Sequence, residues 1–144
     1  MLRTNYGLLK TILLSLITFG IYAIVVYCRV VDDINLVCRK DGKKTMNYAL
    51  LFFIVDPLTL GIAGLVWNHR MCGRIHDQLE KYKIDYNFGS GTFWGWGILG
   101  ALILVGPFIF GHKRFKAMNL INEEFNKRDA KKHHDDDEDE IIDE

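Results

Sequence analysis

The sequence lacks the residue patterns that mark most enzymes. No serine or cysteine lies in a recognisable nucleophile motif, and Gly89-Ser90-Gly91 is not followed by the Gly-Lys-Ser/Thr of a phosphate-binding loop. The three cysteines are odd in number and indicate no disulfide framework. We therefore expect a protein that is not an enzyme and has no catalytic residue, cofactor or resident metal.

Charge is missing from three long stretches. Residues 11–28 and 86–111 carry no formal charge, and residues 45–68 carry only Asp56. A helix that spans a bilayer needs about 20 mostly apolar residues. Three stretches of this length in 144 residues indicate an integral membrane protein rather than a soluble helical core.

The neutral net charge hides an uneven distribution. Eight of the 18 acidic residues lie in residues 135–144, so residues 1–134 hold all 18 basic residues against 10 acidic ones. A basic, apolar body suits contact with anionic lipid headgroups. The acidic tail disfavours nucleic acid as a partner, because it would repel phosphate.

One pattern occurs three times: an apolar stretch that runs directly into an amphipathic, basic helix. A shift of 41 residues superposes Thr18 on Thr59, Gly20 on Gly61 and Arg29 on Arg70, and a weaker third copy places Lys116 under Arg29. The pattern predicts an all-α membrane protein with three transmembrane helical segments from an internal repeat, each continuing into an amphipathic helix, and kinked or re-entrant segments are the alternative. We expect a helical membrane domain over residues 1–127, with copies at about 8–40, 46–83 and 90–127, and a disordered acidic tail over residues 128–144.

After each apolar stretch, the apolar residues keep a spacing of three and four. This spacing predicts an amphipathic helix whose apolar face meets another helix or the lipid interface. The three stripes are Val30, Ile34 and Val37; Met71, Ile75, Leu79 and Tyr82; and Phe115, Met118, Ile121 and Phe125.

Helix breakers interrupt the apolar stretches. Asp56-Pro57 lies in the second, Gly106-Pro107 in the third, and Thr18-Phe19-Gly20 in the first. Asp is a good N-cap and Pro a favoured first helical residue, so one interpretation ends a helix before Asp56 and starts a new one at Pro57. The alternative makes Asp56 and Pro57 a functional intramembrane site for an ion or a proton, since intramembrane carboxylates are often functional.

Two topologies fit the basic residues. With three spans, 12 basic residues lie on the side of the first loop and the C-terminal region and six on the other, which puts the N-terminus outside and the C-terminus in the cytoplasm. The amphipathic helix that follows the second apolar stretch, with Arg70 and Arg74, then lies outside. Re-entrant hairpins that bend at the three breaks would instead keep all three amphipathic helices in the cytoplasm.

The phrase LLSLITFGIYAIVVYCRVVDDIN resembles the opening of the domain-of-unknown-function family 4234 (DUF4234), which are small bacterial membrane proteins. Thr18, Gly20, Ile21, Tyr22 and Asp33-Ile34-Asn35 match that family's pattern, and the resemblance covers roughly residues 8–126. Asp56-Pro57 and the acidic tail depart from it. The resemblance implies the fold and a location in the bacterial inner (cytoplasmic) membrane, and it implies no activity.

Candidate interfacial residues lie where the apolar stretches end: Arg29, Arg70, His69, Cys72, His76 and Lys116. His69, Cys72 and His76 are spaced i, i+3, i+7 on one helix stripe and could meet a metal, but no fourth ligand follows from the spacing.

Two functions remain open. The first is a non-enzymatic membrane scaffold or accessory subunit with a protein partner or homo-oligomer. The alternative is an oligomeric conductor of ions or small solutes that uses Asp56.

Overall fold

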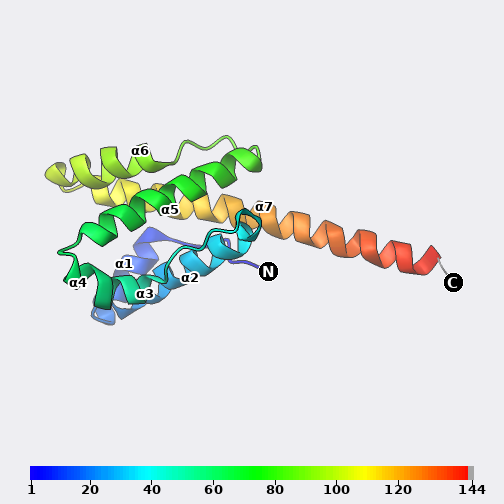
Figure 1. The fold of residues 1–144 in the computed structure, drawn as a ribbon, viewed down its shortest axis with the longest axis horizontal. Coiled ribbons are helices and arrows are strands. Elements are labelled where there is room, and N and C mark those ends of the chain that lie inside the picture. The colour runs from blue at the N-terminus through cyan, green and yellow to red at the C-terminus, as the bar shows by residue number, and fades with distance from the viewer. Residues whose placement is uncertain (143–144) are drawn as a thin grey trace.

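The computed structural model describes the backbone of residues 1–142 and the side chains of residues 1–132. This part of the chain contains helices and no strand, which confirms the predicted all-α class. Three long helices, α2 (Ile21–Val37), α5 (Ile62–Lys81) and α7 (Gly106–Ile142), pack together as a bundle (Figure 1). The end of α7 projects from this bundle.

A shorter helical arm precedes each long helix. The arms are α1 (Leu8–Ile17); α3 (Tyr48–Leu50), η2 (Leu51–Val55) and α4 (Asp56–Leu58); and α6 (Ser90–Thr92), η3 (Phe93–Ile98) and η4 (Leu99–Ile103). A single turn of 3-10 helix, η1 (Arg39–Asp41), follows α2. Each arm runs to one end of the molecule, where the chain turns and returns as a long helix (Figure 1).

Each of the three apolar stretches is interrupted and does not form one continuous helix. Across the described residues, none of the helices combines the length and the apolar content needed to cross a membrane. Each apolar stretch is divided by a turn, at Thr18–Gly20, Thr59–Gly61 and Leu104–Val105. These turns contain residues with positive φ, among them Gly20, Gly61 and Leu104, which an α-helix cannot continue through.

The break in the second stretch differs from the one predicted at Asp56-Pro57. The backbone of Val55 and Asp56 stays helical, and the turn comes three residues later. Pro57 is the second residue of α4, which follows η2 without a break. Gly106-Pro107 likewise opens α7 rather than forming the turn itself.

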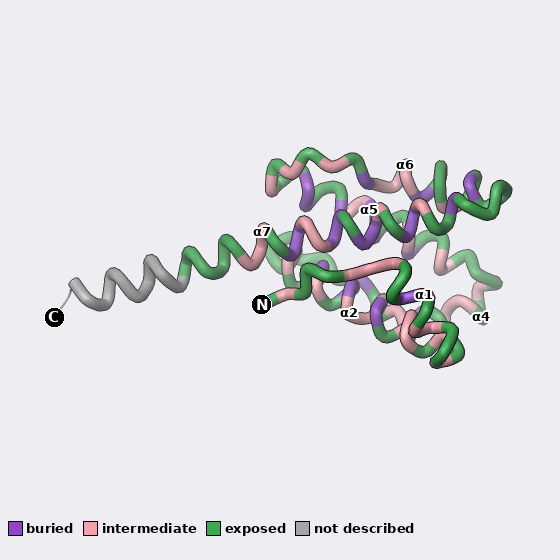
Figure 2. Tube along the Cα trace, turned by 180° about the vertical axis from the view of Figure 1, so that it is seen from behind, coloured by how far each residue is buried: buried purple, intermediate pink, exposed green. Residues whose placement is uncertain are grey.

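The predicted apolar stripes form the core of the bundle. The fully buried side chains come from all three long helices and include Val30, Ile34, Met71, Ile75, Leu79, Phe115, Met118 and Ile121. Figure 2 shows buried positions along α5 and α7 and exposed ones at the ends of the arms. The three exit helices therefore pack against one another, as the spacing of their apolar residues predicts.

The N-terminal segment is fastened to α7 by asparagine side chains. Asn119 donates to the Tyr6 carbonyl at 2.9 Å and accepts from the Tyr6 N–H at 2.8 Å. Asn126 binds the backbone of Leu2 in the same way, at 2.8 and 2.7 Å. Each amide imitates a peptide group, so the extended segment satisfies its backbone without a partner strand.

α7 continues to Ile142. The backbone of residues 128–142 is therefore helical where the sequence analysis expects a disordered tail, and residues 143–144 lie outside the described part. The pairs Lys127–Glu123 and Arg128–Glu124, at 3.0 and 2.8 Å, have the i, i+4 spacing that supports α7 over residues 123–128.

Candidate functional site: the apolar end and its basic girdle

The first two turns have the same hydrogen bonds at an offset of 41 residues. Thr18 Oγ1 donates to the Leu14 carbonyl at 2.7 Å and accepts from the Tyr22 N–H at 3.0 Å. Thr59 Oγ1 makes the equivalent bonds with Val55 and Ala63, at 2.8 and 3.1 Å. Each threonine thus closes the arm and caps the long helix that follows.

The backbone of the two turns is also the same. Gly20 and Gly61 have φ of 87° and 84°, and the residues before them, Phe19 and Leu60, have φ of 52° and 51°. Glycine adopts this left-handed conformation readily, whereas a residue with a Cβ atom pays roughly 1–2 kcal/mol for it. The motif Thr-apolar-Gly therefore codes for the turn in both copies.

The carboxylate of Asp56 caps the start of α5, the helix that follows the second turn. Its Oδ1 accepts from the Gly64 N–H at 2.6 Å, in the first turn of α5. A Cβ atom on Gly64 would lie 2.7 Å from Oδ2 of this carboxylate, so any larger residue there would displace the carboxylate. The equivalent position in the first copy is Ser15, whose hydroxyl is buried and makes no hydrogen bond among the described residues.

The third turn depends on close backbone contact instead. A Cβ atom on Gly100 would lie 2.7 Å from the Cα atom of Gly106, so these two glycines let η4 and the start of α7 touch. Leu104 has φ of 62°. The arm before this turn carries Trp94 and Trp96, both exposed.

The three turns lie together at the end of the molecule away from the C-terminus (Figure 1). Their apolar side chains are exposed: Phe19 by 98%, Leu60 by 91% and Leu102 by 86%. We call this surface the apolar end. Its members are Leu16, Ile17, Phe19, Ile21, Leu58, Leu60, Ile62, Leu99, Leu102, Ile103, Leu104 and Val105.

Basic residues lie at one level on the long helices. Arg29 and Arg70 each come nine residues after the turn glycine, and Lys116 comes ten residues after the start of α7. At a rise of about 1.5 Å per residue, all three lie roughly 13–15 Å from the apolar end. We call these three residues the basic girdle. Lys116 also stands 5.2 Å from the centre of the Tyr86 ring.

His69, Cys72 and His76 do not converge on a metal site. Trp94 Nε1 donates to His69 Nδ1 at 3.1 Å, and His76 Nδ1 lies 3.2 Å from the Phe88 carbonyl. Cys72 is buried in the core, where burial raises the pKa of its thiol. In the part of the chain that the structure describes, no three His, Cys, Asp or Glu side chains are grouped to hold a metal ion.

Arg114 is the main polar residue of the core that the sequence analysis did not single out. It is 2% exposed, donates to Asn68 Oδ1, and lies 3.7 Å from Cys72 Sγ. Its guanidinium stands over the rings of Phe110 and Tyr27, at 4.5 and 5.5 Å from their centres. The signal was present in the sequence, because Arg114 lies four residues after Phe110 and four before Met118 on the buried stripe.

A second polar cluster joins the N-terminal segment to α2 and α7. Tyr6 and Asn122 both donate to Asp33 Oδ2, at 2.6 and 2.7 Å. Burial raises the pKa of the Asp33 carboxyl, although these two hydrogen bonds act in the opposite direction. Burial, together with the bond to Asp33, also raises the pKa of the Tyr6 hydroxyl.

The profile of one protein family, described as a domain of unknown function (DUF4234), matches residues 6–77, which is half of the chain. The chain belongs to this family. The match confirms the resemblance seen in the sequence and covers the first two hairpins up to the end region of α5. No curated protein and no solved structure matches the chain.

Proposed function

We propose that this protein is a non-enzymatic scaffold or accessory subunit that inserts three hairpins into one leaflet of an anionic membrane. The bundle and the projecting part of α7 then lie on the cytoplasmic surface, where they meet a protein partner or a second copy. One observation carries the proposal: three separate turns present exposed apolar side chains at the same end of the molecule. Soluble monomers rarely expose a continuous apolar surface beyond a few hundred Å².

The height of the basic girdle supports insertion to this depth. The hydrocarbon core of a bilayer is about 30 Å thick, so one leaflet contributes about 15 Å. Arg29, Arg70 and Lys116 lie about 13–15 Å from the apolar end, by the helix rise of 1.5 Å per residue. With the turns at the middle of the bilayer, these cations reach the headgroups of the same leaflet.

The conformation of the turn residues points the same way. Phe19 and Leu60 are almost fully exposed and hold a left-handed backbone that costs roughly 1–2 kcal/mol each. The two side chains are almost fully exposed, so their own burial within the protein does not offset this cost. Transfer of such a side chain into an apolar medium contributes about 1.5–3 kcal/mol, which exceeds it.

The contact between the N-terminal segment and α7 supports a location of both on one side of the membrane. The backbone of Leu2 and Tyr6 is bonded to Asn126 and Asn119 of α7. Three full spans would place the N-terminal segment and α7 on opposite sides. We therefore propose the re-entrant topology, with the N-terminus and all three exit helices on the cytoplasmic face.

Asp56 has a structural role in this proposal. Its Oδ1 is bonded to Gly64 at 2.6 Å, which accounts for a carboxylate in an apolar hairpin without an ion path. Asp56→Asn keeps an oxygen acceptor at this position. We expect ion flux in liposomes to be the same for the variant and the parent protein, and a loss of flux with intact assembly would favour the conductor.

Cysteine labelling tests the topology directly. Cys28 is replaced by Ser, and Cys38 and Cys72 are left in place because they are buried. One further cysteine is then introduced in each variant, at Lys43, Lys81 or Lys131, which are all exposed. Each variant is treated with a membrane-impermeant maleimide in vesicles of each orientation.

The proposal expects all three positions to react from the same side. Labelling of Lys81→Cys from the side opposite to Lys43→Cys would establish three spans and refute it. Leu60→Cys serves as the depth control. This residue is 91% exposed in the structure, yet it should react only after detergent is added; reaction in intact vesicles would show that the apolar end lies in water.

A further inference from the structure

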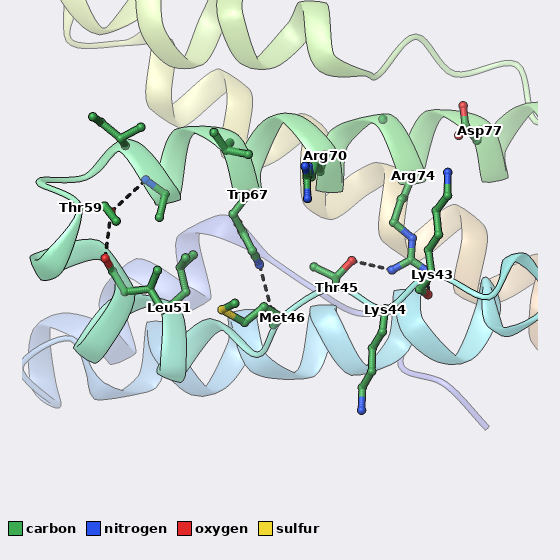
Figure 3. Close-up of a pocket in the computed structure, with 15 residues that line it drawn as sticks. Lys43, Lys44, Thr45, Met46, Leu51, Thr59, Trp67, Arg70, Arg74 and Asp77 are labelled. Atoms are coloured by element: carbon green, nitrogen blue, oxygen red, sulfur yellow. Dashed lines mark hydrogen bonds between the residues drawn. The ribbon is translucent and has the colours of Figure 1, made fainter.

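A cavity of about 970 Å³ lies between α5 and the segment that runs from Lys43 to Thr59 (Figure 3). Its volume is at the upper end of the range of about 300–1,000 Å³ found for ligand pockets. Neither the scaffold role nor the core packing uses this cavity. Its two ends differ in chemistry.

The end near the apolar surface is hydrophobic. Leu51 and Val55 line it from the arm, and Ile62, Ala63 and Val66 line it from α5. Trp67 closes the inner wall and donates its Nε1–H to the Met46 carbonyl at 3.0 Å. The indole is therefore held in place with its polar atom satisfied.

The other end is basic, with Lys43, Lys44, Arg70 and Arg74 among its lining residues and Asp77 at its far edge. Arg74 is committed to the wall: it donates to Asn35 Oδ1 at 2.7 Å, to Thr45 Oγ1 at 2.5 Å and to the Lys43 carbonyl at 2.9 Å. In contrast, the exposed Arg70 makes no hydrogen bond or ion pair within the described residues. Figure 3 shows it beside the cavity, whereas Lys44 points away from α5.

We propose that this cavity binds one anionic glycerophospholipid, with an acyl chain between η2 and α5 and the phosphate at Arg70. The groove runs along α5 from Ile62 to Asp77, about 22 Å at 1.5 Å per residue. Its apolar part begins at the hairpin turn and its basic part lies at the level of the basic girdle. A lipid would thus enter with its chain and headgroup at the depths that they already have in the leaflet.

The first hairpin provides the contrast. The cavity beside it has about 600 Å³ and is lined by uncharged residues, among them Leu8, Ile12, Leu16 and Phe115. Arg29, the counterpart of Arg70 in the first copy, does not line it. Arg29 and Arg70 therefore share a height on the membrane, but only Arg70 adjoins a cavity that can select a headgroup.

The inference rests on the proposed membrane attachment, and tryptophan quenching separates the two. In the full chain, the W94F/W96F variant leaves Trp67 as the reporter of the cavity, and the W67F variant leaves Trp94 and Trp96 as reporters of insertion. Each is reconstituted with phosphatidylglycerol or phosphatidylcholine that carries bromine on the acyl chains. We expect both lipids to quench Trp94 and Trp96 equally, and phosphatidylglycerol to quench Trp67 more strongly.

The charge at position 70 should decide this preference. A basic residue at a membrane surface contributes enough for about a five-fold change in the apparent affinity for an anionic lipid. R70Q should therefore reduce the preference of Trp67 for phosphatidylglycerol about five-fold, whereas the matched control R29Q should leave it unchanged. A63F should fill the apolar part and lower the quenching of Trp67 by both lipids, with Trp94 and Trp96 unaffected.

Each alternative outcome is distinct. No quenching of Trp94 and Trp96 by either lipid would refute membrane attachment itself. If Trp94 and Trp96 are quenched but the two lipids quench Trp67 to the same extent, the lipid cavity alone would be refuted. Equal effects of R29Q and R70Q on the quenching of Trp67 would also refute the lipid cavity alone. If excess inorganic phosphate abolishes the stronger quenching of Trp67 by phosphatidylglycerol, the site recognises a free anion rather than a lipid.

Discussion

The contact between Asp56 and Gly64 predicts that Gly64→Ala lowers the stability of the parent chain but raises it when Asp56→Ala is also present. Gly64→Ala places a Cβ atom 2.7 Å from Oδ2 and 2.8 Å from Oδ1 of Asp56, closer than real Cβ atoms approach oxygen. The carboxylate must move, and the 2.6 Å hydrogen bond to the Gly64 N–H is lost.

The magnitudes follow from two opposing effects. Loss of a hydrogen bond to a charged acceptor costs about 1.5–3 kcal/mol, whereas Gly→Ala in a helix contributes about 1 kcal/mol of stability. Gly64→Ala alone should therefore lower the free energy of unfolding by about 1 kcal/mol. Asp56→Ala alone leaves the Gly64 N–H without its cap and should cost about 1–2 kcal/mol.

The double variant should reverse the first effect. With Asp56→Ala in place no carboxylate opposes the new methyl group, so Gly64→Ala should then raise stability by up to about 1 kcal/mol. The assay is thermal unfolding followed by circular dichroism in one detergent, where 1 kcal/mol corresponds to a shift of about 4 °C in Tm for a chain of this size.

Gly73→Ala is the matched control on the same helix. Its Cβ atom would lie 3.5 Å from Ser90 Oγ, an ordinary contact, so the substitution should be neutral or stabilising in both backgrounds. Additive effects of Asp56→Ala and Gly64→Ala, or a Gly64→Ala variant more stable than the parent chain, would refute the proposed cap.

Three further substitutions test the polar contacts of the bundle. Because the pKa of Asp33 is raised, its contribution to stability is fully present below the ordinary value of 3.8 and is lost as the pH rises through the folded pKa. Asp33→Asn should therefore be more stable than the parent chain at pH 7, and the difference should be smaller in acid. Urea unfolding at the two pH values measures this. Arg114→Lys removes the planar stacking on two rings and should lower stability by about 1–2 kcal/mol, and an unchanged Tm would refute that role. Asn119→Ala should cost about 1–2 kcal/mol and speed amide exchange at Tyr6, whereas the exposed Asn5→Ala should change neither.

Much of the fold could be predicted because it depends on local patterns. The spacing of Met71, Ile75 and Leu79 determines which face of α5 is buried, whatever that face contacts. The repeated Thr-apolar-Gly motif likewise marks the two turns, because a threonine hydroxyl and a left-handed glycine act over a few residues. Disorder of the acidic tail was expected from composition alone, and the structure continues α7 to Ile142.

The parts that were missed depend on particular contacts that the spacing of apolar residues does not predict. Asp56-Pro57 was expected to be the break, but the turn lies at Thr59–Gly61 and the carboxylate acts on Gly64. Arg114 was counted only as a basic residue, although its spacing from Phe110 and Met118 marks the buried face; its contact with Tyr27 depends on the tertiary structure. No spacing rule joins Tyr6 to Asn119 or Asp33 to Asn122.

The sequence by itself determined the helical class, the apolar stretches, the basic exits and the family, because composition and period act locally along the chain. Only the tertiary structure decided that the arms fold back beside the long helices, so that the three turns meet at one end and the N-terminal segment lies on α7. The physical reason is that an apolar stretch is equally apolar whether it continues straight or turns. The choice is made by a few hydrogen bonds and close backbone contacts at each turn, together with the packing of three helices that no single segment contains.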